Sequence, residues 1–192
     1  MYPTHGKQQN KEIETIRPRK IEVKLSDADV KRISEKAAAH GLTVGELIEN
    51  FIGDLVCGTY SNGSDERMYA EQWFDRCWFS MFPDLTFLRY LIEWGGADDV
   101  LRLYDDIQSS KEEISYYEKH PEDAGQDEVA EIQEDIDYWQ EQLDDYWKEY
   151  TEQQKEYKSG TFDEEMKIVL DYWQRYQQFL GEEEAEKQGE NK

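Results

Sequence analysis

Residues 129–150 read VAEIQEDIDYWQEQLDDYWKEY, and the spacing of their apolar side chains decides the fold. Apolar positions return every three or four residues for three heptads, as in a helix that buries one stripe against a second helix. The stretch before it has the same spacing, and a turn beginning at His120-Pro121 separates the two. We therefore predict an antiparallel coiled-coil hairpin, with the following seam: Val100, Leu103, Ile107, Ser110, Ile114, Tyr117, Val129, Ile132, Ile136, Trp139, Leu143, Tyr146 and Tyr150.

The residues on either side of the hairpin extend a helical body. Thr161 and Glu164 form a T-x-x-E capping box, which predicts a C-terminal helix. Residues 65–96 are dense in aromatic side chains, are interrupted by Pro83 and end in two glycines, as expected for further helices. These rings form a core or a protein interface, or they stack on bases, and the scarcity of basic neighbours favours the first two.

The first third of the chain has a different pattern. Apolar side chains at Ile21, Val23 and Leu25 alternate with charged ones, which is the period of a short strand. Two helices are expected after it, because each is preceded by a capping residue and the first is followed by a glycine that can end it. The two caps are Ser26 and Thr43, and the glycine is Gly41.

Together these patterns predict a mainly α protein, with a short N-terminal strand in its head and an all-α body that contains the hairpin. The expected divisions are a flexible basic arm at 1–18, a strand–helix–helix head at 19–57, a linker at 58–64, an aromatic-rich helical segment at 65–96, an acidic coiled-coil hairpin plus C-terminal helix at 97–181, and a disordered tail at 182–192.

Residues 19–57 resemble a ribbon-helix-helix module, in the order of strand and helices, the Gly41 stop and the Thr43 cap. The resemblance implies a homodimer in which one strand from each chain forms a ribbon. It implies that this ribbon enters the major groove of double-stranded DNA and that the second helix begins at a phosphate. The DNA-facing residues it implies are Lys20, Glu22, Lys24, Thr43, Val44 and Gly45. Glu22 places a carboxylate on the reading face, so the alternative is a ribbon that only dimerises.

Charge changes at the end of this head. The chain has 22 Lys and Arg against 45 Asp and Glu, a net charge of −23, and residues 1–57 are neutral with nine of each. Between 128 and 156, eleven acids accompany two bases, although like charges at i, i+4 destabilise a helix. We predict that these acids bind a partner: Glu134, Asp137, Glu141, Asp144, Asp145, Glu149, Glu152 and Glu156. The alternative is a solvated face that keeps the protein soluble.

The charge density of this segment suggests a nucleic-acid mimic. At about 1.5 Å per residue, the nine net charges are about 5 Å apart, against roughly 3.4 Å for one DNA strand. A small, very acidic helical chain of this character resembles anti-CRISPR proteins and other DNA mimics of phages and mobile elements. That resemblance implies a cytoplasmic, non-enzymatic inhibitor of a basic nucleic-acid-binding protein, with a CRISPR RNA-guided DNA nuclease as the favoured target.

Other functions stay open or are disfavoured. The alternatives are a ribbon-helix-helix transcriptional regulator or antitoxin, and a scaffolding coiled coil. An enzyme is disfavoured because the three histidines lie in separate segments and no phosphate loop or nucleophile motif is present. We accordingly expect no catalytic residue, metal site or cofactor. We also expect no membrane contact, because the chain has no long apolar run and anionic lipid repels its charge.

Overall fold

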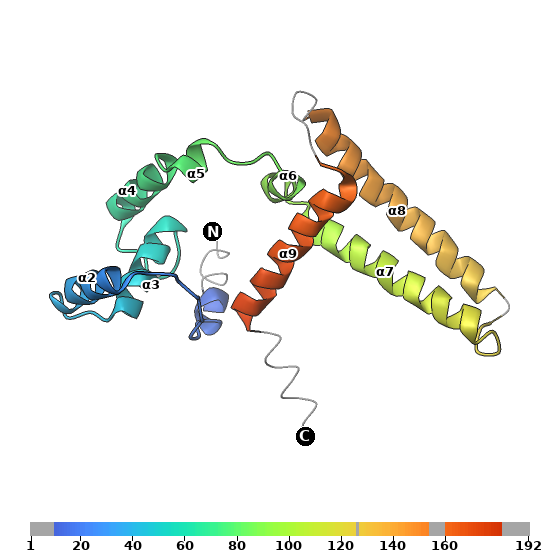
Figure 1. The fold of residues 1–192 in the computed structure, drawn as a ribbon, viewed down its shortest axis with the longest axis horizontal. Coiled ribbons are helices and arrows are strands. Elements are labelled where there is room, and N and C mark those ends of the chain that lie inside the picture. Colours follow the sequence, from blue (N-terminus) through green and yellow to red (C-terminus); the bar gives the residue numbers. More distant parts are fainter. Residues whose placement is uncertain (1–9, 126, 154–159, 182–192) are drawn as a thin grey trace, which may run out of the picture. The chain divides into compact units, whose positions relative to one another are not determined.

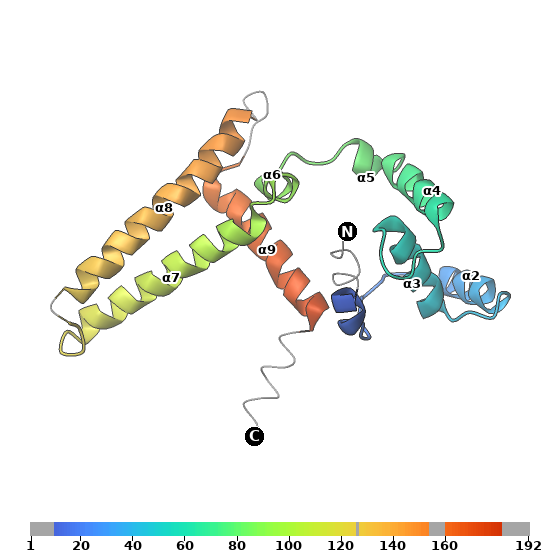
Figure 2. The ribbon, with the colours of Figure 1, turned by 180° about the vertical axis from the view of Figure 1, so that it is seen from behind.

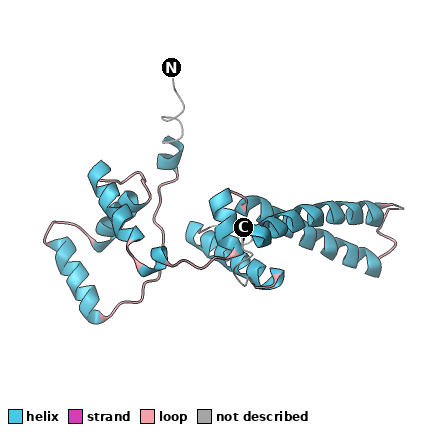
Figure 3. Ribbon diagram, turned by 90° about the horizontal axis from the view of Figure 1, so that it is seen from above, coloured by secondary structure: helices cyan, strands magenta, loops and turns pink. Residues whose placement is uncertain are grey.

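The computed structural model describes residues 10–125, 127–153 and 160–181. These residues are mainly helical, and none of them lies in a strand (Figure 3). The chain forms two compact units, the head unit Met1–Pro83 and the body unit Asp84–Lys192. The boundary therefore falls inside the aromatic segment 65–96, whose first helices belong to the head unit and whose last helix belongs to the body unit.

The head unit is built on one central helix. α3 packs against α2 on one side and α4 on the other, and α4 also contacts α5 (Figure 1). A short helical turn at 10–14 lies within the predicted flexible arm, of which residues 1–9 are outside the described range. The helices are α2 (Asp27–Ala38), α3 (Val44–Leu55), α4 (Ser64–Asp75) and α5 (Trp78–Met81).

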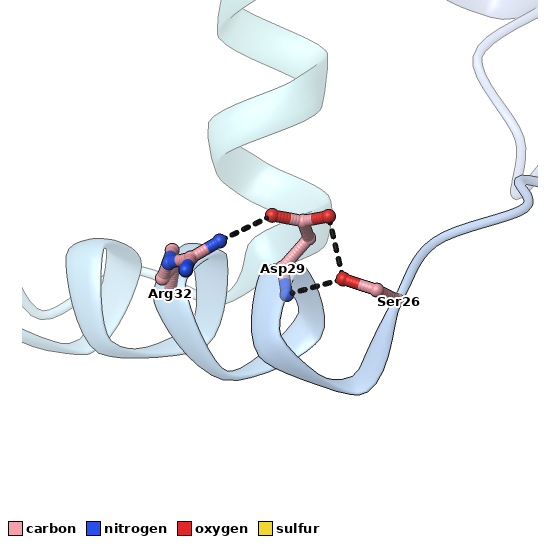
Figure 4. Close-up of polar contacts among 3 residues, drawn as sticks. All are labelled: Ser26, Asp29 and Arg32. Carbon is pink, nitrogen blue, oxygen red and sulfur yellow. Dashed lines mark hydrogen bonds and ion pairs between the residues drawn. The ribbon is translucent and has the colours of Figure 1, made fainter.

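Hydrogen bonds at the start of α2 confirm the predicted cap. The Ser26 hydroxyl accepts from the Asp29 amide at 3.2 Å and donates to the Asp29 carboxylate at 2.6 Å (Figure 4). The same carboxylate accepts from the Arg32 guanidinium at 2.8 Å. The bond from Ser26 and the bond from Arg32 lower the pKa of Asp29. At the other end, Gly41 has a φ of +73°, the left-handed conformation expected of a helix-stop glycine.

The predicted N-terminal strand is absent from the described chain. Ile21, Val23 and Leu25 lie in a loop, and all three side chains are exposed. A strand is defined by hydrogen bonds to a neighbouring strand, and the described part of this chain provides no such neighbour. Alternation of apolar and charged residues thus marks a segment that can pair, but the described part of one chain does not supply the pairing.

Residues 58–64, predicted as a linker, form a packed turn. The Asp54 side chain is 8% exposed and accepts from the Asn62 amide at 2.7 Å and from its Nδ2 at 2.8 Å. A Cβ at Gly53 would lie 2.6 Å from the carbonyl carbon of Tyr60, so only glycine allows this approach. The Gly58 amide donates to the Gly53 carbonyl at 2.8 Å. The turn thereby fixes the start of α4 against the end of α3.

The body unit contains the predicted hairpin. α7 and α8 lie antiparallel along one another (Figures 1 and 2), and the predicted seam positions are buried or half-buried. α9 packs on α6 and α7, and it opens with the predicted Thr161–Glu164 capping box. The predicted tail, 182–192, is outside the described range. The helices are α6 (Phe87–Trp94), α7 (Ala97–Lys119), α8 (Glu128–Gln153) and α9 (Phe162–Leu180).

Two distant side chains fix the beginning of α6. The Glu165 carboxylate, only 7% exposed, accepts from the Phe87 amide at 2.8 Å, and the Tyr150 hydroxyl donates to the Leu85 carbonyl at 2.9 Å. The first bond supplies an acceptor to an unpaired amide in the first turn of a helix. α8 and α9 therefore both position α6, whose Phe87 and Leu91 are fully buried in the core.

Candidate acidic interface and head surface

Seven of the acids predicted to bind a partner lie on the side of α8 that faces away from its core stripe. A helix advances by about 100° per residue, so the seam positions from Val129 to Tyr150 fall in an arc of about 100°. Four of the predicted acids lie within about 30° of the opposite direction, and three more of them flank these within about 70°. The first group is Glu134, Glu141, Asp145 and Glu152, and the second is Asp137, Asp144 and Glu149.

All seven of these side chains are exposed, and we call them the acidic face. The eighth predicted acid, Glu156, lies outside the described residues. From Glu134 to Glu152 the face extends about 27 Å, at about 1.5 Å per residue. Lys148 is the one basic residue of α8. Six net negative charges over this length give about one per 4.5 Å, close to the roughly 3.4 Å of a DNA strand.

Neutral donors, rather than cations, contact two of these carboxylates. Gln133 Nε2 donates to Asp137 at 2.8 Å, and Gln140 Nε2 donates to Asp144 at 2.9 Å. Such i, i+4 bonds hold a carboxylate in place on a helix without cancelling its charge. The acidic face is therefore ordered along the helix and still negative.

Glu149 contacts a residue on another helix, which the sequence did not indicate. Its carboxylate accepts from the Tyr90 hydroxyl of α6 at 2.9 Å. Burial, and then the bond to Glu149, raise the pKa of Tyr90 to about 12. Glu149 thus connects α8 to α6, and a substitution there would remove this bond as well as a surface charge.

The residues assigned to DNA by the ribbon-helix-helix resemblance fall into two groups. Lys20, Glu22 and Lys24 are exposed in the loop before α2. Thr43 is the N-cap of α3, and Val44 and Gly45 are its first two residues. Both groups belong to the head unit.

A carboxylate already occupies the start of α3. Glu46 Oε2 accepts from the Thr43 amide at 2.7 Å and from its hydroxyl at 2.8 Å, which completes the predicted capping box. These bonds lower the pKa of Glu46, so it is ionised at neutral pH. Its charge lies at the Thr43 cap, at the start of the same helix, and opposes the approach of a phosphate there. The start of α3 therefore has the geometry to bind an anion, but the negative charge of Glu46 disfavours one there.

The head unit exposes many large apolar side chains. In its described residues the buried apolar side chains are Ala37 and Ala70, whereas many large ones are exposed. Aromatic rings gather along α3–α5, with centroids 5.3 Å apart for Phe51–Trp73 and 4.3 Å apart for Trp78–Phe82. Trp78 is 75% exposed. Composition indicated the rings but could not indicate that the head would leave them uncovered.

The described residues were also searched for metal-binding groups and membrane-spanning helices. In the described part of the chain, no group of three or more His, Cys, Asp or Glu is placed to hold a metal ion. None of the helices it contains is long and apolar enough to cross a membrane. Cys57 and Cys77 are free. Comparisons with protein-family models, curated proteins and solved structures found no match to this chain.

Proposed function

We propose that this protein is a non-enzymatic inhibitor that binds a basic nucleic-acid-handling protein through the acidic face of α8. The observation that carries the proposal is the acidic face itself, with seven exposed carboxylates and one lysine on the side of α8 away from the core. A surface that served only solubility would not need its acids so strongly in excess, since mixed charges stabilise a helix better.

The packed body makes this face a preformed ligand. α8 is fixed by its seam against α7 and by the bonds from Tyr90 and Tyr150, so few groups on it need ordering when a partner binds. Lysine and arginine side chains that normally contact phosphates would contact these carboxylates instead. Long-range attraction would speed association and make it sensitive to salt. The favoured target is an RNA-guided DNA nuclease, whose positively charged channel holds nucleic acid.

Capture of the partner tests this proposal. Purified protein would be exposed to nuclease-treated host lysate at low and high salt, beside two variants of equal net charge. The face variant is Glu134→Lys, Glu141→Lys, Asp145→Lys, and the control variant is Glu71→Lys, Asp75→Lys, Glu112→Lys. Each triple reversal changes the charge by +6, from −23 to −17. All six side chains are exposed, and Glu149 is left intact.

We expect the wild type and the control variant to capture the same basic nucleic-acid-binding protein at low salt and to release it at high salt. The face variant should capture at least tenfold less. Equal capture by both variants would reject the acidic face as the binding surface. It would leave a scaffolding coiled coil, for which the position of the charge is unimportant.

A second function is favoured for the head unit by its exposed apolar surface. We propose that residues 19–57 pair with a second copy through the segment around Ile21, Val23 and Leu25, forming the ribbon that the described part of one chain lacks. Such a dimer could bind double-stranded DNA as a transcriptional regulator or antitoxin, or could repress the inhibitor's own operon.

Light scattering tests the dimer. The measured mass should be twice 22.9 kDa, and Val23→Glu should reduce it to the mass of one chain. DNA binding lost with Lys20→Ala, Lys24→Ala would support the regulator, and a dimer without DNA binding would restrict the head to dimerisation.

A further inference from the structure

A groove lies between α7 and α9 on the body unit. It has a volume of about 430 Å³, within the size range of ligand sites in proteins. Its walls come from the first half of α7 and the middle of α9. α9 is held there because Met166 and Val169 are buried in the core, which leaves the next turn of the helix beside α7.

The floor of this groove is apolar and aromatic. Leu101 is buried, and Leu170, Tyr104 and Trp173 are partly buried against the core. Since these side chains already pack on one side, their positions are fixed without a ligand. The groove therefore presents two aromatic rings beside aliphatic carbon, a surface suited to a flat or long apolar group.

The rim is acidic. Asp98 and Asp105 line the groove, both exposed and seven residues apart on one side of α7, which is about 10 Å along the helix. Arg102 lies between them, but its guanidinium is paired with Asp99 at 3.3 Å. Two carboxylates and one guanidinium line this rim, which leaves it with one net negative charge. An aromatic floor under an acidic rim complements a cation with an apolar stem.

We infer that this groove binds an arginine side chain of the protein partner. The guanidinium would stack on Trp173 and donate to Asp98 or Asp105, while its methylene stem covers Leu101 and Leu170. Arginine fits better than lysine, because a planar, weakly hydrated guanidinium stacks on a ring and donates in two directions. The inference rests on the proposed binding of a basic protein, and it adds one anchoring residue at a place separate from the acidic face.

NMR of the full chain tests the groove without any partner protein. Indole N–H signals of ¹⁵N-labelled protein would be followed during titration with N-acetyl-arginine methylamide, and the Trp173 signal assigned with Trp173→Phe. N-acetyl-citrulline methylamide, which is nearly isosteric but uncharged, is the control ligand. We expect a saturable shift at Trp173 with the arginine compound, and at least fivefold weaker binding of the citrulline compound.

Two variants separate the groove from general attraction by an acidic protein. Asp98→Asn with Asp105→Asn should weaken arginine binding at least fivefold, whereas Glu134→Gln with Glu141→Gln, which removes the same charge from α8, should leave it unchanged. A Trp173 signal that does not move, moves equally with citrulline, or weakens equally in both variants would overturn the inference. Because no partner is used, such a failure is independent of the capture experiment, and failed capture would not alter the titration.

Discussion

The head unit and the body unit begin their helices by the same rules but bury apolar surface very differently. Each has a T-x-x-E capping box, at Thr43–Glu46 in the head and at Thr161–Glu164 in the body. In the body, eleven buried residues form one core. In the described head, only Ala37 and Ala70 are buried apolar side chains, and Phe51 is 45% exposed. Caps thus decide where a helix starts, and a core requires facing apolar stripes, which the body contains and a single head does not.

The largest expected effect comes from emptying the body core. Leu143→Ala removes a side chain that is 1% exposed and should lower the free energy of unfolding of the body by about 3 kcal/mol. Ile52→Ala in the head, where the side chain is 39% exposed, should cost about 1 kcal/mol or less at low protein concentration. Hydrogen exchange measured peptide by peptide gives the free energy of unfolding of both units in one sample. Equal costs at the two sites would show that the head has a core of its own.

The next effect concerns the buried contact that positions α6. Glu165→Ala leaves the Phe87 amide without its acceptor and should cost about 2 kcal/mol, read from denaturant unfolding of the body. Glu165→Gln is the matched control, because its amide oxygen can still accept the same bond, and it should cost clearly less. If the alanine and glutamine variants were equally stable, the bond would contribute nothing to the body.

An effect of similar size is expected where the head is packed most closely. Gly53→Ala places a Cβ 2.6 Å from the Tyr60 carbonyl carbon, a backbone atom, and should destabilise the α3–α4 turn by about 1–3 kcal/mol. Gly45→Ala is the control, since its nearest contact would be Thr43 Oγ1 at an ordinary 3.7 Å. Thermal unfolding of the head, monitored by hydrogen exchange, would compare the stability of the two variants. Similar behaviour of the two variants would contradict the close approach.

The smallest effect is a pKa at a helix cap. The bonds from Thr43 hold the pKa of Glu46 below its ordinary value, so their contribution is present above that value and is lost as pH falls through the lowered pKa. An NMR titration of the Glu46 carboxyl carbon should therefore give a midpoint that rises toward the ordinary value in Thr43→Ala. An unchanged Glu46 midpoint would argue against the capping box.

How far the sequence could predict these features depends on how local they are. The seam through Ile136 and Leu143 and both capping boxes follow from spacings of three, four and seven residues, and the structure has them in those places. The Glu165–Phe87 bond joins residues 78 positions apart, and no pattern along the chain marks it. The strand failed for a different reason, because pairing needs a second segment that the described chain does not contain.

The candidate sites divide in the same way. The sequence predicted that eight acids between 128 and 156 bind a partner, and the seven of them within the described residues are exposed on the side of α8 away from its core. The sequence could not indicate that Glu149 also contacts Tyr90, or that α9 would form a groove with α7 beside Asp98 and Asp105. Both features depend on how the helices pack. Surface charge could therefore be predicted from the sequence, whereas surface shape could not.

The most direct test of the central claim is a displacement measurement on the captured partner. A fluorescent nucleic acid bound to that partner would be titrated with the wild type, the face variant and the control variant, and its anisotropy followed. If the acidic face of α8 occupies the place of a nucleic acid, the wild type and the control variant will release the probe, and the face variant will need at least tenfold more protein. A ternary complex, in which the protein binds and the nucleic acid stays, would contradict the claim.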